Sequence, residues 1–209
     1  MSKRIVFIIP SIKNRILTLD SLKRCPMAHG VVISRKKGIA HARNYGAKKA
    51  GSGLLVFLDD DLILKDDFWG YVNNTQKGEF SMTFLSGFPC SRVLVIHSED
   101  FWSIGGFDEH IQFTGEDRDF YVRAIDFGLK FKPIPMNVTI HEEHEKREKN
   151  IHVAIGGVKE NVIFILKYGV KHKEVFKVDF LDRFKKGQIR TLLLQLIYFY
   201  YYLFKGVPY

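Results

Sequence analysis

The chain is poor in cysteine and has only a short apolar stretch near its N-terminus. Its 209 residues include two cysteines, Cys25 and Cys90, and these are not spaced as a C-x-x-C pair. Neither a disulfide framework nor a thiolate zinc site is therefore expected, and a reducing compartment fits best. The apolar stretch from Ile5 to Ile9 is too short for a signal peptide, so we expect a cytoplasmic protein.

Two common phosphate-binding motifs are absent as well. The sequence has neither G-x-x-x-x-G-K-[ST] nor a G-x-G-x-x-G between a strand and a helix, which removes the main support for P-loop and Rossmann functions. The net charge is +9, and residues 151–209 hold ten Lys or Arg against four Asp or Glu. Because this charge is not interleaved with stacking aromatic residues over a sheet, we expect no nucleic-acid partner.

The length and the 46% hydrophobic content suit one well-filled core. The first 60 residues alternate strand and helix, as a parallel α/β sheet requires, and strands and helices continue to about residue 134. Residues 151–209 look helical, with glycines at 156–157, 169 and 187 as breaks, so we divide the chain into an α/β domain (1–150) and a helical extension (151–209). The strands expected are 4–9, 31–34, 54–58, 79–85, 92–96 and 130–134, and the helices are 17–23, 40–50, 66–71 and 116–127.

Three consecutive aspartates, Asp59, Asp60 and Asp61, follow the apolar run 54–58. Such a run reads as a buried strand, and carboxylates gathered at its end would repel one another without a cation. Ligands of open α/β sheets bind at the carboxyl ends of the strands, so the triplet indicates a metal site. The alternative is that Asp60 and Asp61 cap a following helix.

A second acidic cluster runs from Gly105 to Asp119. Glu116 and Asp117 open an expected helix, where the helix dipole favours negative charge, but this explains only part of the cluster. Glycines in the cluster allow close approach of the backbone to a polar ligand. The structural alternatives are that Asp108 and Glu109 form a turn and that Asp119 pairs with Arg123 at i,i+4.

Two further candidates for the site are a histidine and an arginine. His141 and His144 are three residues apart, so the zincin motif H-E-x-x-H is excluded, but one of them remains a possible metal ligand. Arg43, on the helix before the aspartate strand, could reach a phosphate or a base edge, or be an ordinary surface arginine.

The end of the chain is apolar and rich in tyrosine. As a helix, residues 191–204 would extend about 21 Å, less than the roughly 30 Å of a bilayer core, so the helix should not span a membrane. Basic residues flank it, and residues 185–205 therefore suit the inner face of a membrane as a peripheral contact. The alternative is packing on the domain or on a second copy of the chain.

Six features of the chain occur in a fixed order: I-I-P-S at 8–11, G-I-A-H-A-R-N-Y-G at 38–46, F-L-D-D-D at 57–61, G-G-F-D-E at 105–109, G-E-D-R-D-F-Y-V-R at 115–123 and His141. Taken together, they resemble a GT-A fold glycosyltransferase, most closely family 2, over about residues 4–144. The G-E-D segment also resembles that of the β-1,4-galactosyltransferases. The resemblance implies a compact α/β fold with a mostly parallel central sheet flanked by helices.

The resemblance also assigns roles to individual residues. Asp59 would face the ribose or nucleotide, and Asp61 and His141 would hold a divalent metal on the donor diphosphate. Asp117 resembles the general base, with Glu116 orienting the acceptor hydroxyl. The donor-binding residues implied in this way are Pro10, Ser11, Arg43, Asp59, Asp60 and Gly106.

The implied activity is a Mn²⁺- or Mg²⁺-dependent, inverting hexosyl transfer from a UDP- or GDP-sugar to a hydroxyl of a sugar, glycan or lipid-linked acceptor. A base on the face opposite the leaving group would give inversion by direct displacement. The family's V-D-D-G-S segment has no counterpart between Pro10 and Asn44, which leaves the donor base open. The alternatives are a sugar-nucleotide nucleotidyltransferase, for which residues 10–13 make a poor phosphate loop, and a non-catalytic module that binds nucleic acid or sugar nucleotides.

Overall fold

The computed structural model describes residues 4–23, 30–85, 88–111, 115–142, 151–168, 171–172 and 189–206. The strands are β1 Ile5–Pro10, β2 Val31–Ser34, β3 Leu54–Leu58, β4 Leu62–Leu64, β5 Glu79–Leu85, β6 Phe88–His97, β7 Lys130–Ile134 and β8 Thr139–His141. The helices are α1 Leu17–Leu22, α2 Ile39–Ala50, α3 Phe68–Asn74, α4 Ser98–Ser103, α5 Glu116–Asp126, α6 Ile151–Tyr168 and α8 Ile189–Lys205, with a 3-10 turn η1 at Met136–Val138.

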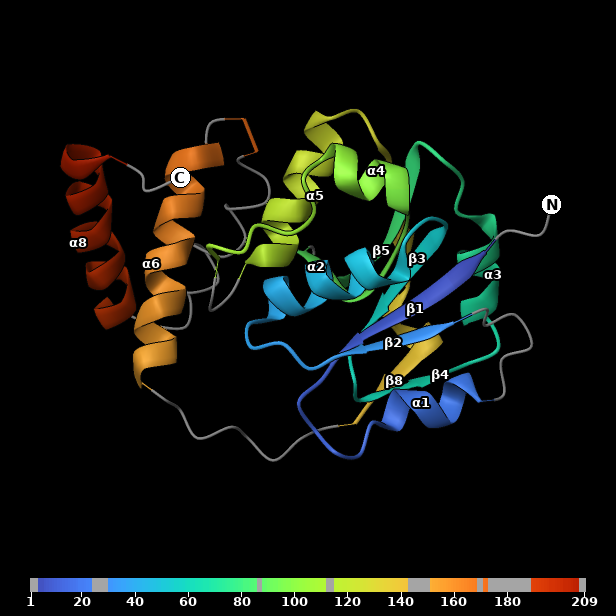
Figure 1. Cartoon of the computed structure of the whole chain (residues 1–209). Helices are drawn as coiled ribbons and strands as arrows, with labels where there is room; N and C mark the ends of the chain where they lie inside the picture. Colours follow the sequence, from blue (N-terminus) through green and yellow to red (C-terminus); the bar gives the residue numbers. More distant parts are fainter. Residues whose placement is uncertain are drawn as a thin grey trace.

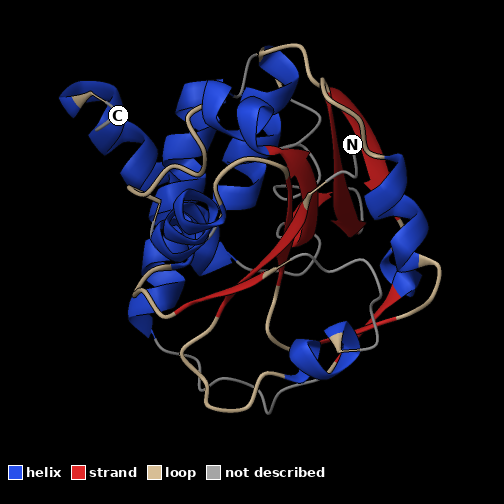
Figure 2. Cartoon of the chain, turned by 45° about the vertical axis from the view of Figure 1, so that its right-hand side comes forward, coloured by secondary structure: helices blue, strands red, loops and turns tan. Residues whose placement is uncertain are grey.

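A six-stranded sheet has the strand order β2-β1-β3-β6-β5-β7. Figures 1 and 2 show the sheet with helices packed around it. β1 pairs in parallel with both β2 and β3, which confirms the βαβαβ start. β5 and β6 form an antiparallel hairpin whose second strand also lies antiparallel to β3, while β5 and β7 are parallel. The sheet is therefore mixed, with parallel pairing at both ends and antiparallel pairing in the middle.

Successive side chains of the central strands enter two separate cores, because neighbouring residues of a strand point to opposite faces of the sheet. Val6 and Ile8 of β1 pack in the core beneath α2, α4 and α5. Ile5, Phe7 and Ile9 pack in the core on the other face, which α1 and α3 cover. Both faces of β1 and β3 are thus buried, which explains why these strands are apolar at nearly every position.

One alternative and one expectation about local structure are wrong. The segment after the aspartate triplet is the short strand β4, so Asp60 and Asp61 do not cap a helix. Gly156 and Gly157 lie inside α6 and do not break it. Three short elements, β4, α4 and β8, were not expected from the sequence. The predicted breaks at Gly169 and Gly187 lie outside the described residues.

The helical extension docks on the α/β domain through α6, and α8 packs on α6 (Figure 1). Asp119 of α5 is fully buried and pairs with Arg123 at 2.6 Å, as the i,i+4 spacing predicted. It also accepts a 2.7 Å hydrogen bond from the Tyr168 hydroxyl and lies 3.3 Å from the Lys167 ammonium. The end of α6 is therefore fastened directly to the helix that begins with the G-E-D segment.

Candidate active site

The candidate site lies where β1 and β3 end. Because β2 and β3 lie on opposite sides of β1, the strand order reverses there, and a crevice opens beyond the carboxyl ends of the strands. A pocket of about 590 Å³ occupies this position. Its lining includes Pro10, Ser11, Ile12, Lys13, Lys36, Lys37, Gly38, Ile39, Ala42, Arg43, Asp59, Asp60, Asp61 and Glu116.

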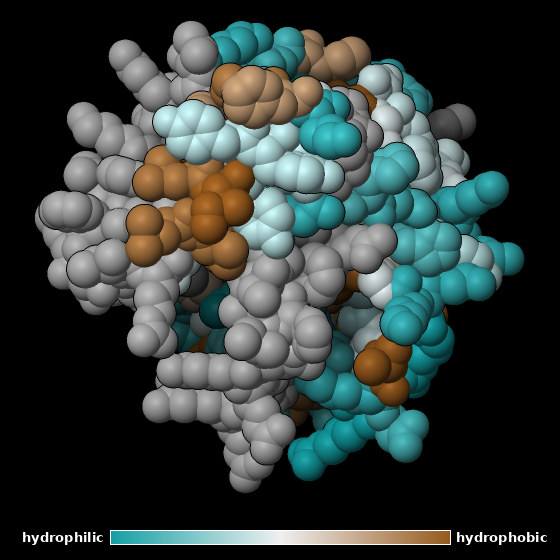
Figure 3. Space-filling model, turned by 90° about the vertical axis from the view of Figure 1, so that its left-hand side faces the viewer, coloured by the Kyte–Doolittle hydropathy of each residue, from teal (hydrophilic) through white to brown (hydrophobic). Residues whose placement is uncertain are grey.

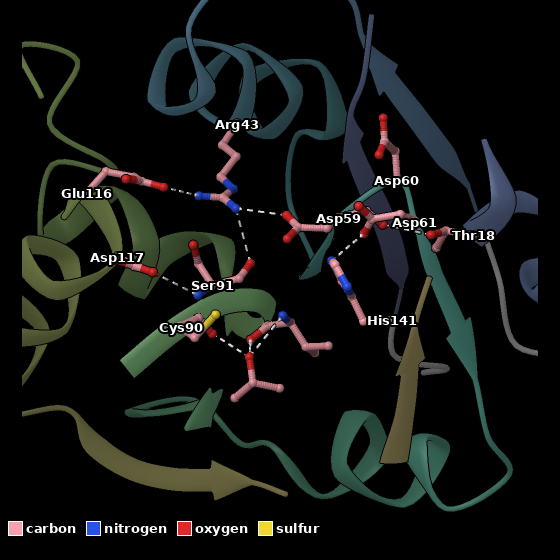
Figure 4. Close-up of polar contacts among 12 residues, drawn as sticks. Thr18, Arg43, Asp59, Asp60, Asp61, Cys90, Ser91, Glu116, Asp117 and His141 are labelled. Carbon is pink, nitrogen blue, oxygen red and sulfur yellow. Dashed lines mark hydrogen bonds and ion pairs between the residues drawn. The ribbon is translucent and has the colours of Figure 1, made fainter. Parts of the chain in front are cut away.

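The three aspartates point in three directions, as Figure 4 shows. The Asp59 carboxylate accepts a 3.1 Å hydrogen bond from Arg43 Nη2, whereas Asp61 Oδ1 lies 3.3 Å from His141 Nε2. Asp60 lies 2.8 Å from the Lys13 ammonium and accepts a short hydrogen bond from the Ser11 hydroxyl. The tight turn between β3 and β4 thus separates like charges by giving each carboxylate a different partner.

Arg43 is a buried clamp rather than a surface arginine. Its Nη1 donates to Glu116 Oε1 at 3.0 Å, and its Nη2 donates to Asp59 at 3.1 Å and to the Ser91 carbonyl at 3.2 Å. Burial lowers the pKa of the guanidinium, but the surrounding carboxylates outweigh this and raise it. Through these bonds Arg43 joins the aspartate triplet to the G-E-D segment. Only 3% of the residue is exposed, so the connection is made from the buried side of the pocket.

Glu116 and Asp117 open α5, as expected, after Gly115 in a left-handed conformation (φ 99°). Asp117 Oδ1 accepts a 2.9 Å hydrogen bond from the Arg118 amide, and Oδ2 a long one of 3.4 Å from the Ser91 amide. Removal from water, reinforced by the charge of Glu116, raises the pKa of Asp117 to about 6. A carboxylate with this pKa is ionised at neutral pH and basic enough to accept a proton.

The pKa of Asp59 is raised as well, although this carboxylate has a cationic partner. Removal from water raises its pKa, and the Asp61 charge adds to this, while the guanidinium of Arg43 opposes the shift. Asp59 and Asp117 therefore differ in their surroundings, although both lie close to Arg43. The ion pair with Arg43 suits Asp59 for binding a ligand, and Asp117 is the better candidate for proton transfer.

Asp61 and His141 fit a divalent cation. β4 begins directly after Asp61 and pairs with β8 so that Leu62 is opposite His141, which brings the imidazole to the carboxylate. Neighbouring ligands about 2.1 Å from an octahedral Mg²⁺ or Mn²⁺ are about 3 Å apart, close to the 3.3 Å observed between Oδ1 and Nε2. Within the described ranges no group of three or more His, Cys, Asp or Glu could hold a metal, so a cation bound to Asp61 and His141 would need other ligands as well. Magnesium sites typically use one or two carboxylates plus water and substrate phosphate.

The cations around the pocket were not predicted from the sequence. Lys13, Lys36 and Lys37 line it, together with Gly38 and the first turn of α2, where unpaired backbone N–H groups favour anions. The available signal was the basic cluster 35–37 directly before a glycine and a predicted helix. These cations suit the pocket to a phosphorylated ligand.

Asp117 and His141 are not among the residues that line the pocket, and neither is Gly106. Its carbonyl accepts a 2.8 Å hydrogen bond from Arg123 Nη1, and an added Cβ would lie only 2.8 Å from Asn44 Oδ1. Asn44 in turn bonds both backbone groups of Phe107. Gly106 thus permits close packing of the G-G-F-D-E loop on α2. His144 lies outside the described residues.

A sequence model described as Glycosyl transferase family 2 matches residues 18–122. No curated protein matches the sequence. The fold is similar to a mannosyltransferase from Pyrobaculum calidifontis in complex with GDP-Man and Mn²⁺ (TM-score 0.64, 13% identity, 99% of this chain and 76% of that one). It is also similar to glucosyl-3-phosphoglycerate synthase from Mycobacterium tuberculosis in complex with Mn²⁺, UDP and phosphoglyceric acid (TM-score 0.60, 14% identity, 80% and 79%).

A third similar structure is the catalytic domain of Drosophila β1,4-galactosyltransferase 7 in complex with xylobiose (TM-score 0.55, 19% identity, 71% of this chain and 76% of that one). At these identities the likenesses establish the fold, which is the GT-A arrangement of a central sheet flanked by helices.

Proposed function

The chain belongs to glycosyl transferase family 2, and from this premise we propose that it transfers a hexose from a nucleotide-diphosphate sugar to an acceptor hydroxyl, with inversion and with Mn²⁺ or Mg²⁺ as cofactor. The observation that carries the proposal is the Asp59–Arg43–Glu116 clamp, which joins the aspartate triplet and the G-E-D segment around one pocket. Residues 1–150 would perform the reaction, and residues 151–209 would be an accessory extension.

The metal-binding side of the site would be Asp61 and His141. When bound there, the cation would supply charge that stabilises the departing diphosphate. Asp59 would contact the nucleotide, and Pro10 and Ser11 would border it at the end of β1. Lys13, Lys36 and Lys37 are placed to offset the charge of the phosphates. The solved relatives bound to GDP-Man or UDP agree with a UDP- or GDP-sugar donor.

The proton-accepting side would be α5. Asp117 and Glu116 lie across Arg43 from Asp61 and His141, so the proposed base and the proposed metal site are separated (Figure 4). The acceptor oxygen would form a bond to the anomeric carbon as the bond to the diphosphate oxygen breaks, and its proton would pass to an Asp117 carboxylate oxygen. Glu116, which Arg43 holds in place, would orient the acceptor hydroxyl. Attack on the face opposite the leaving group inverts the anomeric centre.

Donor binding is the first test. UDP- and GDP-sugars are screened with Mn²⁺ for a rise in Tm, because a ligand that binds only the folded state stabilises it by RT ln(1 + [L]/Kd). We expect one nucleotide class to stabilise the protein only with metal, and Asp61→Asn to abolish the effect. Asp20→Asn, which changes an exposed aspartate of α1, is the matched control. Equal stabilisation of the wild type and Asp61→Asn would refute the metal assignment.

A further inference from the structure

Helix α8 is apolar on two opposite sides. One side packs on α6, where Tyr202 is buried against Val162 and Ile163, with Tyr198 and Phe199 beside it. The other side, here called the outer face, has no contact with the described part of the chain that explains its composition, and Figure 3 shows a patch of apolar side chains on this side of the molecule. The outer face consists of Leu193, Leu196, Ile197, Tyr200, Tyr201, Leu203 and Phe204, which are 52% to 85% exposed.

The outer face is broad. At 100° per residue its seven members fall within an arc of about 160°, and between residues 191 and 204 this arc contains no charged residue. A coiled-coil seam is narrower, because it uses only the a and d positions of a heptad. Single exposed apolar residues are ordinary, but a contiguous patch of this kind marks a binding surface. Its width suits a flat partner.

The charges of the tail favour an anionic partner. Residues 185–205 contain four Lys or Arg and no Asp or Glu. Lys205, at the end of α8, is exposed. Tyr200 and Tyr201 provide the aromatic side chains that are enriched where a membrane meets water. Among the described residues no helix is long and apolar enough to cross a membrane.

We propose that the outer face of α8 binds an anionic lipid surface, with the helix lying parallel to the membrane and its apolar side chains at the headgroup boundary. The 17 residues of α8 would cover about 25 Å of that surface. The structure divides the tyrosines of the helix: Tyr200 and Tyr201 face the lipid, whereas Tyr198 and Tyr202 hold α8 on α6.

This docking would also fix the active site relative to the membrane. α8 packs on α6, and the end of α6 is fastened to the buried Asp119 of α5 through Tyr168 and Lys167. α5 begins with Glu116 and Asp117. If the proposed transferase function holds, on which this step alone rests, the acceptor is a hydroxyl of a membrane-borne molecule.

The test is co-sedimentation of the full chain with vesicles, which needs neither donor nor activity. Wild-type protein should sediment with phosphatidylcholine vesicles that contain about 30% phosphatidylglycerol and much less with pure phosphatidylcholine. The triple variant Leu196→Gln/Ile197→Gln/Phe204→Gln should bind at least about tenfold more weakly. Phe127→Gln, which removes a 56% exposed aromatic residue directly after α5, should bind like the wild type.

The exposed positions should allow the triple variant to fold, and its Tm and far-UV circular dichroism check this. The dependence of wild-type binding on the anionic fraction tests the proposal without any variant. Absence of wild-type binding to anionic vesicles would overturn it, as would equal binding of the triple variant. A wild-type dimer in vesicle-free solution that the triple variant converts to a monomer would assign the outer face to a second copy instead. Loss of donor stabilisation in Asp61→Asn with intact vesicle binding would leave this proposal standing.

Discussion

Replacing Asp117 by Asn tests two consequences of its unusual surroundings, one for the stability of the fold and one for proton transfer. Its pKa is raised from 3.8 to about 6, and one pKa unit corresponds to about 1.4 kcal/mol, so ionised Asp117 costs the folded state about 3 kcal/mol. Because the folded-state pKa is the higher one, the penalty is absent below about pH 4, grows between pH 4 and pH 6, and is complete above pH 6. Asn carries no charge at any of these values.

Removal of the charge should therefore raise the stability of Asp117→Asn relative to the wild type by about 2–3 kcal/mol between pH 4 and pH 8. The new amide NH₂ group would face the Ser91 N–H, which now lies 3.4 Å from Oδ2, and this contact offsets about 1 kcal/mol at every pH. Urea denaturation at pH 4 and pH 8 measures the free energy of unfolding of the variant relative to the wild type. The contribution of the contact is the same at both pH values, so it cancels when the two results are subtracted.

The same substitution should lower transfer by about 10²- to 10⁴-fold, since it removes the proton acceptor, while metal-dependent donor binding remains. Wild-type turnover should fall about tenfold per pH unit below pH 6. A stability gain that is identical at pH 4 and pH 8 would refute the raised pKa. Loss of donor binding in Asp117→Asn would show that Asp117 binds the donor and would refute its role as the base for the acceptor hydroxyl.

Three further substitutions test packing around the site, each by urea denaturation. Arg43→Met should cost about 3–5 kcal/mol, because it leaves two partly buried carboxylates without their cation. Tyr168→Phe should cost about 1–3 kcal/mol, since the buried Asp119 loses a 2.7 Å hydrogen bond. Gly46→Ala should cost about 1–3 kcal/mol, because the new Cβ would lie 2.4 Å from Ile8 Cγ2.

Each of these substitutions has a matched control. Lys48→Met on the exposed side of α2 and Tyr200→Phe on α8 should stay within about 0.5 kcal/mol of the wild type. Gly70→Ala, in a helix with open space around the new Cβ, should stabilise by about 0.5–1 kcal/mol, the opposite sign to Gly46→Ala. Equal effects in a variant and its control would contradict the corresponding contact.

Much of the fold could be predicted because its signals are local. β1 and β3 are covered on both faces, so they are apolar almost throughout, and α2 ends at Gly51 with a positive φ, as its sequence indicated. The short elements β4 and β8 were missed, because a three-residue strand has too little periodicity to distinguish it from a turn. Gly156 and Gly157 were expected to break the helix but do not, since packing of α6 overrides their low helix propensity.

The sequence alone determined the order of strands and helices, the candidate residues and the chemistry that carboxylates and an imidazole can perform. Only the tertiary structure decided which of these residues meet. Arg43 reaches Asp59 and Glu116, 16 and 73 residues away, because α2, the end of β3 and the start of α5 converge at one edge of the sheet. His141 meets Asp61 because β8 pairs with β4. Such contacts depend on strand pairing and on burial in a shared core, and neither is recorded in the local sequence.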